Sequence, residues 1–171
     1  MRNSLLFDFS VIKENNIIEV KREFTASLEL VWDAWTKPKL LDLWWAPKPW
    51  QTKTRSMDFR AGGFWLYAMT SLTDQKHWCR ADYQKIESQT SFSHLDSFCD
   101  ENGNINQEFP RSQWRNVFNQ NADTTTVSVS IKYETLIDLE KIIAMGFKEG
   151  FTMGLQNLDE LLETLSKQTK I

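Results

Sequence analysis

The segment MGFKEGFTMGLQNLDELL, residues 145–162, decides the fold. Its large apolar residues recur every three or four positions, which is the pattern of an amphipathic helix. A helix of about twenty residues is about 30 Å long, so its apolar stripe needs a large partner surface. We expect an antiparallel sheet to provide that surface. The apolar positions are Phe147, Phe151, Leu155, Leu158, Leu162 and Leu165.

The segments that precede this helix carry strand patterns separated by polar turns. We expect two strands within residues 5–26, four within residues 52–100 and two within residues 112–134. The last of these strands is the clearest, because Val127 and Val129 alternate with serines as they do in a half-buried strand. A curved antiparallel sheet wrapped around the terminal helix would bury the apolar faces of both.

Short helices are expected between and after these strands. Ser27 stands at an N-cap position, and Pro38 suits the first turn of a second helix. That helix runs into LLDLWWAPKPW, residues 40–50, which holds three of the eight tryptophans of the chain. Rigid indoles beside a proline-stiffened loop can form a pocket wall at little entropic cost. A further helix is expected from Thr135 to Gly146, ahead of the long one.

Composition restricts the class of protein. The 171 residues fit one domain, residues 1–171, and 41% hydrophobic with 25% charged residues is a globular balance. A net charge of −3 without a basic run argues against nucleic acid or an anionic membrane as partner. We expect neither a signal peptide nor a membrane span, because the N-terminal apolar stretch is short and interrupted by Asp8, and we therefore expect a cytoplasmic protein, either monomer or homodimer.

The two cysteines are expected to be free thiols. A hairpin register with Glu87 opposite Thr90 places Cys79 opposite Phe98. Strand side chains alternate between faces, so Cys99 then points to the other side of the sheet. Two reduced thiols also suit a reducing compartment.

Motifs for metal binding or catalysis are missing from the sequence. In the same register, His77 and His94 lie about 20 Å apart, too far to share a metal ion. No serine nucleophile elbow, phosphate-binding loop or CxxC occurs. We therefore expect no cofactor and no metal, and we assign no catalytic residue.

The order of the elements and several motifs resemble the helix-grip fold of the START-like, or SRPBCC, superfamily, which includes the birch-pollen allergen. REFTASLELVWDAWTKPKLLDLWWAPKPW, residues 22–50, is similar to the opening of the branch named for activators of the heat-shock protein 90 ATPase. The turn DFRAGG (residues 58–63), SFCDENGN (residues 97–104) and the closing helix follow in the order of that branch. The resemblance covers residues 5–165. It implies an α+β fold in which a curved antiparallel sheet of six to seven strands wraps a long C-terminal helix, with two short helices closing one end.

The resemblance also implies a pocket between the concave face of the sheet and the long helix. We predict that this pocket binds a small hydrophobic or amphipathic molecule, driven by desolvation of apolar ligand surface. Most of the predicted lining residues are aromatic, and Arg80 is the polar member. They are Trp44, Trp45, Trp65, Tyr67, Met69, Trp78, Arg80, Phe98, Trp114, Phe147, Phe151 and Leu155.

Three alternatives remain open. The aromatic residues could simply fill the core, as large rings do in ordinary interiors. The same cavity could hold a cyclase- or hydrolase-like enzyme that uses Arg80 or Asp82, since one fold hosts many functions, although we favour a protein that is not an enzyme. The name of the branch implies a third possibility, a chaperone ATPase of the heat-shock protein 90 type as partner.

Overall fold

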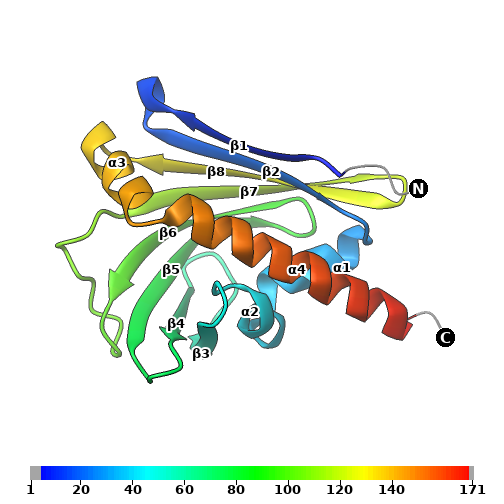
Figure 1. Ribbon diagram of the computed structural model, residues 1–171, viewed down its shortest axis with the longest axis horizontal. Helices are drawn as coiled ribbons and strands as arrows, with labels where there is room; N and C mark the ends of the chain where they lie inside the picture. The colour runs from blue at the N-terminus through cyan, green and yellow to red at the C-terminus, as the bar shows by residue number, and fades with distance from the viewer. Residues whose placement is uncertain (1–4, 170–171) are drawn as a thin grey trace.

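In the computed structural model, which describes residues 5–169, one antiparallel sheet grips a long helix (Figure 1). The strands pair in the order β1-β2-β8-β7-β6-β5-β4-β3. The α+β helix-grip class is therefore confirmed. The sheet has the eight strands that the sequence pattern predicts and not the six to seven that the resemblance implies, because both strands of the N-terminal hairpin join its β8 edge. The strands are β1 (Phe7–Ile12), β2 (Ile17–Phe24), β3 (Gln51–Met57), β4 (Phe64–Thr70), β5 (Lys76–Glu87), β6 (Ser91–Cys99), β7 (Ser112–Asn121) and β8 (Thr124–Tyr133).

The helices begin where the sequence predicts. Ser27 Oγ accepts a hydrogen bond from the Leu30 amide at 3.2 Å, and Thr135 Oγ1 accepts one from the Asp138 amide at 3.1 Å. Gly146 separates the last two helices with a φ of +92°, a conformation that glycine adopts without strain. Figure 1 shows α4 crossing one face of the sheet, with α3 beside its first turns. The helices are α1 (Leu28–Thr36), α2 (Pro38–Trp44), α3 (Leu136–Ala144) and α4 (Phe147–Thr169), with a short 3₁₀ turn at Lys13–Asn15.

The β5–β6 hairpin sets which side chains face the helix. Cys79 lies opposite Phe98, as predicted, but the turn differs, because Glu87 pairs with Ser91 instead of the preceding threonine. A bulge at Gln84 absorbs the difference of one residue and restores the predicted register further along the strands. Both cysteines are free.

The double glycine before β4 has a steric reason. A side chain at Gly63 would overlap the carbonyl oxygen of Asp58, so only glycine allows this close approach. The turn is fastened to β5 by two hydrogen bonds of 2.9 Å, from the Gly62 amide to the Tyr83 carbonyl and from the Tyr83 amide to the Gly63 carbonyl. The turn thereby fixes the start of β4, the strand that carries Tyr67 into the interior.

Helix α4 is fastened to the chain at the end of α2. The buried side chain of Asn157 donates from Nδ2 to the Ala46 carbonyl at 3.1 Å and to the Trp44 carbonyl at 3.4 Å. Gly154 allows the approach, because a Cβ at this position would lie 3.2 Å from the Trp45 carbonyl oxygen. This junction, formed by Asn157 and Gly154 on Trp44–Ala46, sets the height of the helix above the sheet.

We expect Asn157→Ala to lower the free energy of unfolding by about 1–3 kcal/mol, because two buried carbonyl oxygens lose their donor. Gln156→Ala is the matched control, since the neighbouring side chain is exposed and we expect its removal to change stability by less than about 0.5 kcal/mol. Urea denaturation of both variants measures the difference. Equal stabilities would mean that the junction contributes nothing to the fold.

Candidate functional site

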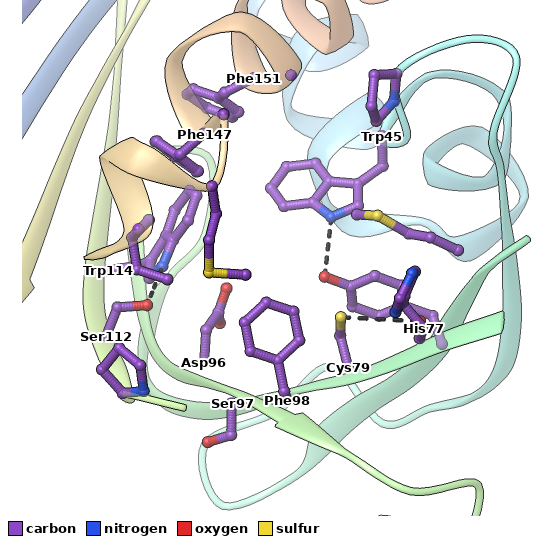
Figure 2. Close-up of a pocket in the computed structure, with 18 of the residues that line it drawn as sticks. Trp45, His77, Cys79, Asp96, Ser97, Phe98, Ser112, Trp114, Phe147 and Phe151 are labelled. Carbon is purple, nitrogen blue, oxygen red and sulfur yellow. Dashed lines mark hydrogen bonds between the residues drawn. The ribbon is translucent and has the colours of Figure 1, made fainter. Parts of the chain in front are cut away.

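A cavity of about 340 Å³ lies between the first turns of α4 and the sheet (Figure 2). Its volume falls within the range of small-molecule sites, and its wall is predominantly apolar. The exposed side chains of His77 and Met145 are part of the lining, so the cavity reaches the surface beside them. The lining comprises Trp45, Pro47, Tyr67, Met69, His77, Cys79, Asp96, Ser97, Phe98, Pro110, Ser112, Trp114, Tyr133, Ile142, Met145, Gly146, Phe147, Gly150 and Phe151.

Trp45 forms one wall. It directly follows α2, and its Nε1 donates to the Tyr67 hydroxyl at 3.0 Å, which fixes the orientation of the indole (Figure 2). Its ring also makes edge contacts of 5.7 Å with Trp65 and 6.0 Å with Phe151, between ring centroids. Because neighbours hold the ring on several sides, this wall is preorganised.

The adjoining wall is built where α4 meets β7, and its Trp114 ring lies 5.9 Å from the Trp45 ring between centroids. Phe147 and Phe151, one helical turn apart, stack with ring centroids 5.3 Å apart. Trp114 meets Phe151 edge to face at 5.6 Å, and its Nε1 donates to Ser112 Oγ at 2.9 Å. The polar edge of each indole is thus paired while its carbon rings remain available to the cavity.

Seven of the predicted site residues lie together in this lining. Their contact with a ligand stays a prediction. They are Trp45, Tyr67, Met69, Phe98, Trp114, Phe147 and Phe151.

Three other predicted residues belong to the packed core beside the cavity. Trp44 is 1% exposed, and its Nε1 donates to the Ala34 carbonyl at 2.9 Å. Trp65 stacks on Tyr67 with centroids 3.9 Å apart, so Tyr67 and not Trp65 faces the space. Leu155 is 2% exposed and lies one turn beyond Phe151 along α4, after the cavity has ended.

The predicted residues Trp78 and Arg80 lie on the outer face of β5, outside the lining of this cavity. Up to the bulge at Gln84, the inward residues of this strand are its odd-numbered ones, whereas Trp78 lies under the Arg55 guanidinium at 5.9 Å from the ring centroid. Arg80 lies over Phe64 and pairs with Asp82 at 2.6 Å. Strand alternation therefore also places Asp82, the enzyme candidate, outside the cavity.

Sequence reasoning missed the polar residues of the lining, above all Asp96. Asp96 shares a face of β6 with Phe98, two residues away, so alternation from a predicted lining residue would have found it. Figure 2 shows its carboxylate pointing into the space between Trp114 and Phe98. Its side chain is 19% exposed.

Asp96 belongs to a chain of hydrogen bonds that runs away from the cavity. One carboxylate oxygen lies 2.5 Å from Nδ1 of His94, and Nε2 of His94 lies 3.0 Å from Nδ2 of Asn116. The same Asn116 nitrogen donates to the Phe92 carbonyl at 3.3 Å. His94 and Asn116 are both buried, and the imidazole is stacked between Trp114 and Phe92 with centroids 5.4 and 5.5 Å away.

Burial keeps the thiol and the two phenol groups of the cavity lining neutral. Burial, followed by the nearby negative charge of Asp96, raises the pKa of the Cys79 thiol to about 12. Burial also holds the pKa of Tyr67 well above its ordinary value, and that of Tyr133 is raised for the same reason. At neutral pH these groups offer hydrogen bonds and no charge.

Within residues 5–169, no group of three or more His, Cys, Asp or Glu side chains is arranged to hold a metal ion. None of the helices in the same range combines the length and the apolar character that a membrane crossing requires.

Known proteins share this fold and most of this chain. The family model "Activator of Hsp90 ATPase homolog 1-like protein" matches residues 25–163. A protein from Mycobacterium smegmatis is 25% identical over 93% of this chain and 97% of its own, with a TM-score of 0.84. A protein from Arthrobacter aurescens is 24% identical over 92% and 91%, with a TM-score of 0.87. An AHSA1 protein from Silicibacter pomeroyi is 15% identical over 86% and 98%, with a TM-score of 0.70. Among curated proteins none matches the chain.

We expect slow alkylation of both cysteines by iodoacetamide at pH 8. The reactive species is the thiolate, and a pKa of about 12 leaves only about one Cys79 thiol in ten thousand ionised at this pH. Burial raises the pKa of Cys99 to about 11, so we expect it to react about tenfold faster than Cys79. Mass spectrometry after timed labelling measures both rates, with urea-unfolded protein as the reference. Rapid labelling of Cys79 in the native protein would contradict the buried, neutral thiol.

Proposed function

The chain belongs to the family of Activator of Hsp90 ATPase homolog 1-like proteins, and on that basis and from its cavity we propose that it binds a small hydrophobic or amphipathic molecule between the sheet and α4. The observation that carries the proposal is the apolar cavity of about 340 Å³, whose two indoles are held in place by hydrogen bonds from Trp45 and Trp114. Fixed walls reduce the side-chain entropy that a ligand must overcome on binding.

The driving force is removal of apolar surface from water. Each Å² of apolar ligand surface buried contributes about 25 cal/mol, so enclosure by Trp45, Phe98 and Phe151 favours a flat or chain-like apolar body. The polar lining atoms, among them the Ser112 hydroxyl and the Asp96 carboxylate, would then select the orientation of the molecule.

An enzymatic function in the same cavity is a second candidate. The hydrogen bond between His94 and Asp96 favours it, because a carboxylate held by an imidazole is a common acid–base arrangement. Turnover of a small ester, amide or polyketide-like compound that disappears in Asp96→Asn would support this candidate.

Regulation of a chaperone ATPase is the alternative that the family name carries. It would involve a protein surface and not the cavity. Measuring the ATPase activity of an Hsp90-type chaperone with and without the purified protein tests this alternative. We expect no stimulation.

We expect the neutral dye N-phenyl-1-naphthylamine to bind the wild-type protein and to quench its tryptophan emission by energy transfer. Gly150→Leu should weaken binding about tenfold, since losing about 55 Å² of apolar contact costs about 1.4 kcal/mol. A Cβ at Gly150 meets only a ring carbon of Pro47 at 3.7 Å, so the longer side chain can enter the cavity without disturbing α4.

Leu72→Ala is the control for dye bound to exposed apolar surface, because Leu72 is 82% exposed and outside the cavity. We expect its dye affinity to equal that of the wild type. Absence of dye binding, or equal affinities for wild type and Gly150→Leu, would refute the proposed binding site.

A further inference from the structure

We infer that the ligand of this cavity is a cationic amphiphile, whose ammonium group pairs with Asp96 while its apolar body lies among the aromatic rings. This inference rests on the proposed ligand-binding function and specifies the chemistry of the bound molecule. Three observations carry it: the hydrogen-bond geometry around His94, the lack of a lysine or arginine paired with Asp96, and the aromatic character of the surrounding wall.

The hydrogen bonds around His94 assign a role to each of its ring nitrogens. The Phe92 carbonyl can only accept, so it holds the amide of Asn116 with its NH₂ group toward both Phe92 and His94. The same nitrogen of Asn116 lies 3.0 Å from Nε2 of His94 and has a second hydrogen to donate, so we assign Nε2 as the acceptor. The ring proton then lies on Nδ1 and is donated to Asp96. His94 orients the carboxylate without cancelling its charge.

Within residues 5–169, no lysine or arginine forms an ion pair with Asp96. Among the ion pairs in this part of the chain, only His94 is a partner of Asp96. Arg80 and Arg111 are next in sequence to the two residues that pair with Asp96 on the neighbouring strands. Both form ion pairs with Asp82 on the outer face of the sheet. With Cys79 and Tyr67 neutral, Asp96 leaves the cavity with one uncompensated negative charge.

The rings around this charge favour the same class of ligand. Figure 2 shows Trp45, Trp114, Phe98 and Phe147 around the space into which the Asp96 carboxylate points. The faces of such rings carry partial negative charge and attract ammonium groups, most strongly when water is excluded. A carboxylate inside an aromatic wall repels anionic amphiphiles such as fatty acids and attracts amines.

The test compares three probes of one shape: 4-phenylbutylamine, 4-phenylbutan-1-ol and 4-phenylbutanoate. Each competes with N-phenyl-1-naphthylamine at pH 7.5 in wild type, Asp96→Asn and Asp82→Asn. In the wild type we expect the amine to bind at least about tenfold more tightly than the carboxylate. Asp96→Asn should remove this preference and leave the affinity for the alcohol within about twofold. Asp82→Asn is the matched control, since it removes the same charge from the outer face of the adjacent strand, and it should keep the preference.

Each outcome has a distinct meaning. If the alcohol binds but the wild type does not prefer the amine, or if Asp96→Asn keeps the preference, the cationic ligand is refuted and the cavity remains a binding site. If neither the dye nor any probe binds, the proposed function itself fails. The comparison of probes in the wild type needs no variant, so it decides the question even if Asp96→Asn does not fold.

Discussion

The junction between α4 and the end of α2 is the constraint on which the rest of the structure depends. Asn157 supplies donors to carbonyls that the last turn of α2 cannot pair, and Gly154 lets the two backbones approach. Beyond the junction, Leu158 and Leu162 pack fully into the core. Before it, the helix is held away from the sheet, so its first turns span a space that their side chains do not fill. The same helix therefore packs into the core with its later turns and lines the cavity with its first turns.

The tryptophans explain why the space persists. An indole is flat and rigid, and here most indoles meet their neighbours edge to face, as Trp45 does with Trp44 at 5.2 Å. Hydrogen bonds from Trp45 to Tyr67 and from Trp114 to Ser112 further limit their rotation. Rings fixed in this way cannot collapse into the cavity as flexible aliphatic chains would, which separates a lined pocket from a poorly packed core.

The sequence predicts the fold better than it predicts the site. Helix caps, strand alternation and the Gly62–Gly63 turn are local signals, and each agrees with the structure. Which face of β5 is concave is not local, because size and hydrophobicity favour Trp78 while the inward positions hold His77 and Cys79. The polar network was missed for the same reason: alternation relates Asp96 to Phe98, but only the folded sheet brings Asn116 of the next strand to His94.

The placement of Asp96 also indicates where this protein trades stability for function. A carboxylate in an apolar wall loses hydration, and the imidazole of His94 returns only one hydrogen bond. A leucine or asparagine in place of Asp96 would be buried at a lower electrostatic cost. Replacing the buried His94 in the same way would also lower that cost. The fold tolerates the charge because the cavity leaves Asp96 partly exposed and because the His94–Asn116–Phe92 chain holds the carboxylate in one orientation. A charge that is oriented but not paired with a lysine or arginine, beside the cavity at the N-terminal end of α4, is better suited to recognising a molecule than to stabilising the fold.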